Sequence, residues 1–161
     1  MMMDKEKLTL ALADIPSGLY IACVKDGEQI DGFLASWVSQ VSFEPPLLMI
    51  AIKPERNIHQ QVLDGAIFTL NVVGEHNKSI MKPFWNGYYE EDENPFETIS
   101  YRVNAHGGVV MDDARSTITC KLLESHLPGD HRVVIARVLE SEIITHEVST
   151  LLHWRTSGMD Y

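Results

Sequence analysis

The sequence is poor in cysteine. Cys23 and Cys120 are its only two thiols, and no CxxC pair occurs. Rubredoxin-type, zinc-ribbon and iron–sulfur sites all need clustered thiolates, so these classes are excluded. Isolated cysteines in apolar surroundings are typical of core residues, and we expect both to be buried.

Positive charge is also scarce, with 13 Lys and Arg against 23 Asp and Glu and a formal net charge of −10. A general nucleic-acid binder neutralises phosphates with cations, so that class is excluded, and an anionic ligand would need a local positive pocket. The apolar runs are well short of the roughly 20 residues that a membrane span requires. Residues 1–14 place charges before a short Leu-rich stretch, unlike a secretory signal, and we expect a cytoplasmic location.

Several signatures of nucleotide-binding and catalytic folds are absent as well. There is no GxGxxG turn, no Walker loop and no GxSxG nucleophile elbow. Seven histidines occur, but none forms an HExxH or HxH pair, and we expect no metal site.

What the sequence does contain is a succession of short β patterns. A chain of 161 residues with 45% apolar types predicts one domain over residues 1–161. Residues 18–25 form a β-rich run that ends at an Asp-Gly pair, 26–27, a dipeptide favoured in tight hairpins. A second β run follows over residues 28–43, and the proline pair at 45–46 interrupts it.

The next elements alternate between strand and helix. Residues 47–52 indicate a strand buried on both faces. Residues 57–64 predict a short helix with Asn57 as its N-cap and Gly65 as its stop. Residues 67–73 predict another strand.

A second short helix is a candidate over residues 76–85, where Pro83 would cut it. The composition of residues 86–97 is that of a surface loop, and the acidic run at 90–93 is typical of a solvated face. Two further β runs cover residues 116–124 and 132–139. At least six strands with only short helices, and no repeated βαβ spacing, favour a mainly β antiparallel barrel over a doubly wound sheet.

Polar residues gather in the first half of the chain. They comprise a small-residue strand at 35–40, a basic turn at 53–57 and Asn71. Strand hydroxyls, an arginine beside a helix N-terminus and backbone N–H groups are what a phosphate monoester needs. A purely structural interpretation stays open, in which the serines satisfy a half-exposed strand and Arg56 pairs with Glu55.

Four segments carry a resemblance to a known family. These are residues 32–46 (GFLASWVSQVSFEPP), 53–57 (KPERN), 65–73 (GAIFTLNVV) and 129–131 (GDH). In order and spacing they resemble the flavin reductase-like family of FMN-binding split barrels. The string LASWVSQ is most similar to the flavin-reductase module attached to flavodiiron proteins in cyanobacteria, a module that we expect to stand alone here.

The resemblance implies a split β-barrel with a few short helices, assembled as a homodimer with FMN near the subunit interface. The cofactor-binding residues that it implies are Ala35, Ser36, Trp37, Val38, Ser39, Lys53, Arg56, Asn57 and Asn71. Of these, residues 35–38 would line the isoalloxazine ring and ribityl chain, and Asn71 would sit beside the flavin. Ser39, Arg56 and Asn57 would hold the phosphate, although Glu55-Arg56-Asn57 stands where the family often has Ser-Arg-Thr.

The activity implied is an NAD(P)H-dependent flavin reductase, in which His131 faces the nicotinamide or the flavin edge as the catalytic residue. The alternative is an electron carrier that holds FMN and exchanges electrons with a redox protein partner, and a flavin-free structural relative is a third possibility. The sequence does not distinguish NADH from NADPH, nor FMN as prosthetic group from FMN as substrate.

Plain structural roles remain open for the same residues. Trp37 would then fill core volume, and His131 would be a turn histidine hydrogen-bonded to Asp130. At the C-terminus, Trp154 or Tyr161 would cover a flavin pocket unless the tail is frayed.

Overall fold

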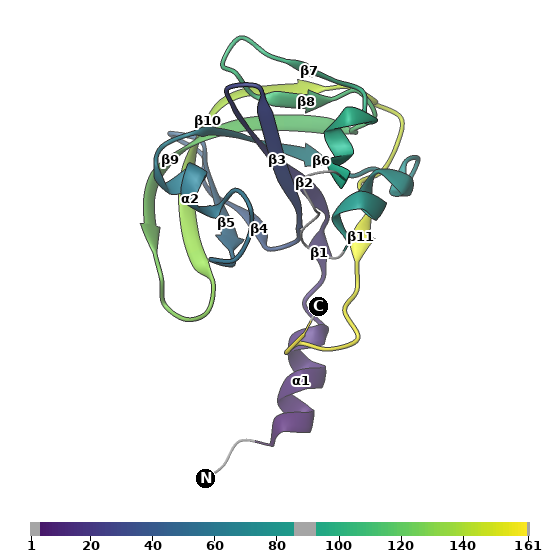
Figure 1. The fold of residues 1–161 in the computed structure, drawn as a ribbon. Helices are drawn as coiled ribbons and strands as arrows, with labels where there is room; N and C mark the ends of the chain where they lie inside the picture. The colour runs from purple at the N-terminus through teal and green to yellow at the C-terminus, as the bar shows by residue number, and fades with distance from the viewer. Residues whose placement is uncertain (1–3, 86–92, 161) are drawn as a thin grey trace.

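The structure is a computed structural model that describes residues 4–85 and 93–160. Its body is a seven-stranded antiparallel sheet that curls into a barrel, with strand order β3-β2-β6-β9-β10-β5-β4 (Figure 1). The strands are β2 (Tyr20–Asp26), β3 (Gln29–Ala35), β4 (Val38–Ser42), β5 (Leu47–Ile52), β6 (Ile67–Val72), β9 (Ser116–His126) and β10 (Arg132–Ile143). The predicted mainly β, antiparallel fold is confirmed.

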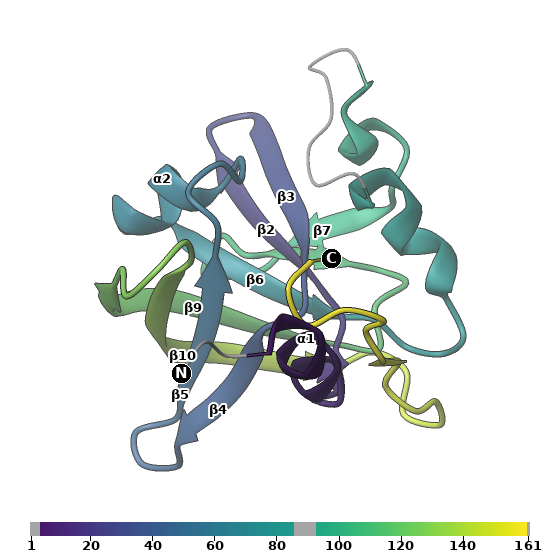
Figure 2. The same cartoon turned by 90° about the horizontal axis from the view of Figure 1, so that it is seen from below.

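Outside this sheet, the described residues also form two small strand pairs and four short helices. The pairs are β1 (Ser17–Gly18) with β11 (Leu152–His153), and β7 (Tyr101–Val103) with β8 (Val109–Met111). The helices are α1 (Lys5–Ala13), α2 (His59–Leu63) and the 3₁₀ helices η1 (Lys78–Phe84) and η3 (Pro95–Glu97). Helix α1 projects below the barrel with the end of the chain beside it (Figures 1 and 2). None of the helices in the described ranges is long and apolar enough to cross a membrane.

Strand β2 lies between two hydrophobic cores, because both of its faces are covered. Ala22 and Val24 belong to the core enclosed by the barrel strands. Ile21 and Cys23 point the other way, into a second core that η1, η3 and β8 cover. Both cysteines of the chain are buried, as predicted. Strand β5 does not share this arrangement: its residues alternate between half-buried and buried, so the prediction of burial on both faces was wrong.

The hairpin from β2 to β3 is confirmed, and Gly27 has the positive φ of 58° that its turn needs. The continuous second run over residues 28–43 was wrong. The chain breaks at Ser36 and Trp37, where the Val38 N–H donates to the Ser36 carbonyl at 3.1 Å. Strand β3 pairs with β2 before the break and β4 pairs with β5 after it, so the two edge strands of the sheet meet at this turn.

The helix predictions were partly correct. Gly65 ends the first helix with a φ of 90°, as expected, but the cap residue is Ile58 and not Asn57. The second helix is the 3₁₀ helix η1, which contains Pro83 without being cut by it. Most of the acidic run at 90–93 lies outside the described residues. Helix α1 was not predicted; Asp4 caps it by accepting from the backbone N–H groups of Glu6 and Lys7.

Candidate functional site

Two cavities flank the turn between β3 and β4. Ser36 lines the first, which has a volume of about 310 Å³, and the next residue, Trp37, lines the second, of about 290 Å³. Five of the ten sequence-predicted residues are therefore brought together as two groups. Ser36 and Arg56 belong to the first cavity, while Trp37, Lys53 and His131 belong to the second.

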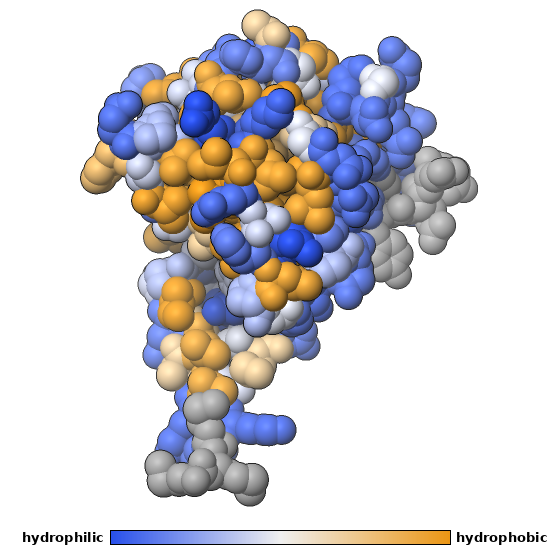
Figure 3. All heavy atoms as spheres, turned by 90° about the vertical axis from the view of Figure 1, so that its left-hand side faces the viewer, coloured by the Kyte–Doolittle hydropathy of each residue, from blue (hydrophilic) through white to orange (hydrophobic). Residues whose placement is uncertain are grey.

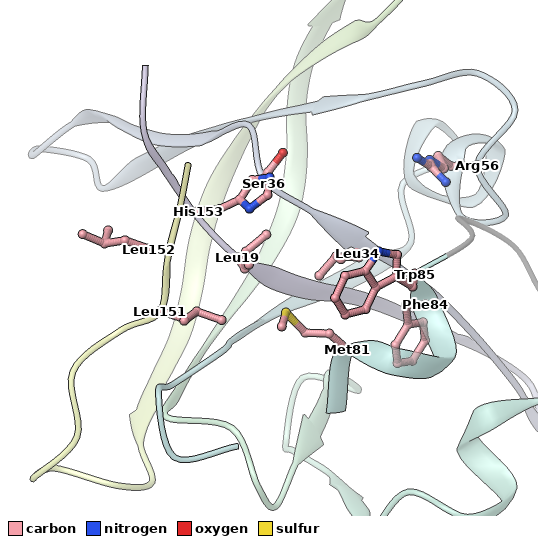
Figure 4. A pocket seen from close by; sticks show the side chains of 10 residues that line it. All are labelled: Leu19, Leu34, Ser36, Arg56, Met81, Phe84, Trp85, Leu151, Leu152 and His153. Carbon is pink, nitrogen blue, oxygen red and sulfur yellow. The ribbon is translucent and has the colours of Figure 1, made fainter. Parts of the chain in front are cut away.

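The first cavity has mainly apolar walls (Figure 4). Its apolar residues are Leu19, Leu34, Met81, Phe84, Trp85, Leu151 and Leu152. Trp85 follows η1 directly and remains 68% exposed, so a large aromatic surface is available at the cavity edge. An apolar, aromatic cavity with few polar groups is the usual form of a small-molecule site.

Arg56 brings a positive charge to this apolar cavity. Its position follows from the turn before α2: the Arg56 N–H donates to the Lys53 carbonyl, and the Arg56 carbonyl accepts from His59, each at 3.0 Å. The guanidinium carbon lies 5.6 Å from the centroid of the Phe33 ring, within the range of a cation–π contact. Arg56 is half-buried, which leaves its charge less screened than on an open surface.

The second cavity contains a ring contact between Trp37 and His131. Their ring centroids are 4.6 Å apart and their planes are tilted by 45°. Lys53 lines the same cavity, and Arg155 from the C-terminal segment places its guanidinium carbon 5.5 Å from the centroid of the Trp37 ring. Two aromatic rings and two cationic side chains thus line this cavity.

His131 is 9% exposed, and its Nδ1 atom lies 2.9 Å from a carboxylate oxygen of Asp130. This contact lowers the pKa of the Asp130 carboxyl, mainly through the hydrogen bond to His131 and also through the charge of the imidazole when it is protonated. A carboxylate on one ring nitrogen fixes the orientation of the imidazole and favours the proton on Nδ1. The hydrogen bond expected of a turn histidine is present, and it leaves the ring against the cavity.

Asn71 lies elsewhere, in the second core. Its side chain is 0% exposed and donates to the carbonyls of Ile21 and Val109 at 3.3 and 3.1 Å. Its amide oxygen accepts from the Met111 N–H at 2.8 Å. Asn71 therefore ties β6 to β2 and β8 and lines neither cavity, and its place beside a bound flavin stays a prediction.

The remaining predicted residues are close to the cavities in sequence but line neither of them. Ala35 is buried in the barrel core and Val38 packs against it. Ser39 is exposed on β4, where its hydroxyl donates to the Gln40 carbonyl at 3.3 Å. Asn57 is half-buried after the basic turn.

The C-terminal segment was expected to cover a pocket through Trp154 or Tyr161, and it does line both cavities, but through other residues. Leu151 to His153 line the first cavity, and Arg155 with residues 158–160 lines the second. The tail is not frayed through residue 160, because β11 pairs with β1 and the Gly158 N–H donates to the Thr9 carbonyl at 2.9 Å. Trp154 lines neither cavity, and Tyr161 lies outside the described residues.

Side chains of the types that ligate metals are scattered in the part of the chain that the structure describes. There, no three His, Cys, Asp or Glu side chains gather in a group that could hold a metal ion. The polar groups at both cavities are mainly cationic or neutral donors, which suit an anion better than a cation.

The chain is similar to known sequences over nearly its whole length. The sequence profile described as flavin reductase like domain matches residues 12–160. Diflavin flavoprotein A 1 from Synechocystis sp. is 30% identical over 158 residues, which are 98% of this chain and 27% of that protein. The chain thus spans about a quarter of the length of this curated relative.

Solved structures resemble the whole fold. The NADH:FAD oxidoreductase SgcE6 from Streptomyces globisporus, in complex with NAD and FAD fragments, superposes with a TM-score of 0.80 at 19% identity, covering 94% of this chain and 91% of that one. The flavin reductase PheA2 in its native state also gives a TM-score of 0.80 at 19% identity, with 94% of each chain covered.

Proposed function

Because this chain belongs to the flavin reductase-like family and has the split-barrel fold of its solved relatives, we propose that it binds FMN and catalyses its reduction by NADH or NADPH. The observation that carries the proposal is the pair of cavities at the turn between β3 and β4. The first cavity has apolar walls and an arginine, and the second contains a tryptophan and a histidine in ring contact.

The residues of the first cavity fit a flavin mononucleotide. Its apolar and aromatic walls match a planar ring system, and Ser36 and Arg56 supply a hydroxyl and a guanidinium for the polar chain and the phosphate. A hydrogen bond to a charged group contributes roughly 1.5–3 kcal/mol, so one or two such bonds would offset the repulsion from an acidic protein. Ser39 and Asn57 remain proposed contacts of the phosphate, and Lys53 remains a proposed cofactor-binding residue.

When bound, FMN supplies the redox chemistry by accepting a hydride from the reduced nicotinamide. The protein's own contribution is to bind, to orient and to exclude water. Trp37 presents an aromatic face at the second cavity, and Asp130 holds the His131 ring against that face. We assign His131 the positioning of the nicotinamide donor, with its proton held on Nδ1 by the Asp130 carboxylate.

A homodimer forms part of the proposal, and the barrel surface supports it. Figure 3 shows a broad apolar area on the side of the barrel where β5, β9 and β10 lie. The exposed apolar side chains on β4, on β9 and in the connections that follow them include Val41, Phe43, Leu123 and Leu127. A contiguous apolar surface of this kind on a folded domain usually marks an interaction site.

A second candidate function is electron exchange with a protein partner. It is favoured by the relative from Synechocystis sp., a diflavin flavoprotein of which this chain matches 27% of the length. In that case FMN would be bound firmly at the same cavity, and a reduced partner protein rather than a nicotinamide would deliver the electrons.

One experiment separates these functions. The purified chain is titrated with FMN and then mixed without oxygen with NADH, with NADPH or with a reduced ferredoxin-type protein. Rapid bleaching of the flavin absorbance by either nicotinamide supports the reductase. Bleaching only by the reduced protein supports the carrier, and no FMN binding at all contradicts both.

A further inference from the structure

The C-terminal segment, residues 151–160, forms a wall of both cavities. Its first part, through His153, lines the first cavity, and Arg155 with residues 158–160 lines the second. Figure 2 shows this segment, in yellow, running beside helix α1. One short stretch of chain therefore borders both halves of the candidate site.

The segment is held in place by backbone contacts on both sides of Arg155. Before it, β11 pairs with β1. After it, Gly158 packs so closely on α1 that a Cβ atom at this position would lie 2.2 Å from the Cβ of Leu12 and 2.7 Å from the Thr9 carbonyl oxygen. Only glycine permits this approach, so the position of Arg155 between the two anchors is well defined.

Arg155 itself sits between helix α1 and the second cavity. One terminal nitrogen, Nη2, donates to the Leu12 carbonyl at 2.8 Å, and the guanidinium carbon lies 5.5 Å from the centroid of the Trp37 ring. A guanidinium has five N–H donors in a planar fork, and the bond to Leu12 occupies one of them. This contact orients the fork without using up its capacity for an anion.

The second cavity is lined by charges of both signs. Lys53 and Arg155 supply two permanent positive charges in a protein whose net charge is −10. Two carboxylates line the cavity as well. Asp130 is bonded to His131 and its side chain is 81% exposed, while Asp160 stands on the tail itself. Arg155 is the cation that lies over the Trp37 face.

We propose that Arg155 is a specificity-determining residue for the electron donor, whose guanidinium binds the diphosphate of a reduced nicotinamide dinucleotide at the second cavity. This inference rests on the proposed reductase function. The planar fork of arginine matches two phosphate oxygens at once, which a lysine at the same position would not do. The tail that carries Arg155 thus takes the place of the Rossmann phosphate loop that the sequence lacks.

The test compares full-length wild type with Arg155→Met in steady-state reduction of FMN by NADH. We expect the KM for NADH to rise about tenfold to a hundredfold with kcat and the Kd for FMN nearly unchanged. Arg155→Lys should recover part of the loss and make the KM more sensitive to salt than in Arg155→Met. Lys78→Met is the matched control, because Lys78 is exposed and lines neither cavity, and its KM should equal that of wild type.

A donor without phosphate separates recognition from a structural role. Wild type and Arg155→Met should oxidise N-benzyl-1,4-dihydronicotinamide at the same rate, because this donor has no diphosphate for Arg155 to bind. Equal loss of activity with both donors would show that Arg155 only holds the tail, and an unchanged KM for NADH would likewise overturn the proposal. If wild type is reduced by neither donor, the reductase function itself fails.

Discussion

The ring centroids of Trp37 and His131 lie 4.6 Å apart, although the two residues come from opposite ends of the barrel sequence. Trp37 stands at the break between β3 and β4, and His131 immediately precedes β10. A carboxylate oxygen of Asp130 lies 2.9 Å from Nδ1 of the imidazole. The ring contact joins two sequence motifs, the string at 35–38 and the Gly-Asp-His turn at 129–131. The first prediction therefore concerns His131.

His131→Ala should lower the turnover of FMN reduction about tenfold while changing the Kd for FMN by less than about threefold, because His131 lines the second cavity and not the first. Stopped-flow mixing with NADH and a separate FMN titration measure the two quantities. His126→Ala is the control, since His126 is an exposed histidine that lines neither cavity. Wild-type turnover in His131→Ala would remove the histidine from the mechanism.

The contact between Asp130 and His131 predicts a pH dependence of stability. The pKa of Asp130 is lowered in the folded protein, so the unfolded chain takes up its proton first as the pH falls. The contribution of Asp130 should be fully present above about pH 4, the ordinary carboxyl pKa, and should be lost as the pH falls through the lower folded value. Urea unfolding of wild type and Asp130→Asn across pH 2–6 measures it, and a difference that grows in acid would contradict the assignment.

Arg56→Met should weaken FMN binding by about tenfold to a hundredfold, because a hydrogen bond to a charged phosphate would be lost. Riboflavin has the same ring and ribityl chain without the phosphate, so its affinity should be the same in wild type and variant. Fluorescence titration with both flavins measures the effect. A parallel loss of riboflavin binding would mean that Arg56 shapes the cavity through its contact with Phe33 instead of binding phosphate.

Asn71→Ala should destabilise the fold by about 2–4 kcal/mol, because the variant leaves two buried carbonyls and the Met111 N–H without their partner. Chemical unfolding measures the loss. Asn77→Ala serves as the control, since Asn77 is a partly exposed residue whose one side-chain bond is to Ser79. If Asn71→Ala keeps full stability but loses affinity for FMN, Asn71 contacts the flavin and is not mainly a structural residue.

Phe43→Ser should shift the protein from dimer toward monomer. Phe43 is 87% exposed in the turn between β4 and β5, and a large apolar side chain at this level of exposure would be buried by a second subunit. Light scattering over a concentration series measures the molar mass. Trp154→Ser is the matched control, because Trp154 is also largely exposed but stands on the tail. A wild-type monomer at all concentrations would contradict the dimer.

The strands were predictable where local pattern and long-range packing agree. The Asp-Gly turn after β2 needs a positive φ that glycine adopts freely. The β run predicted over residues 116–124 lies within β9, which pairs with both β6 and β10. The break at Ser36 and Trp37 was not predictable in the same way. The β pattern runs through it without interruption, and only the closure of the barrel gives β3 and β4 different partners.

The candidate site, too, was predictable from the sequence only in part. The string at 35–38, the basic turn and the Gly-Asp-His turn identified the family from residue types and spacing alone, and the cytoplasmic location stays a prediction of that kind. Burial, by contrast, depends on what covers a residue. Asn71 lies in the core because η1, η3 and β8 cover the second face of β2, and Arg155 reaches Trp37 because the tail docks on α1. The sequence by itself determined the chemistry that is available, through backbone preferences and residue types. Only the tertiary structure decided which of those groups meet in a cavity, because contacts between distant segments leave no periodic pattern in the chain.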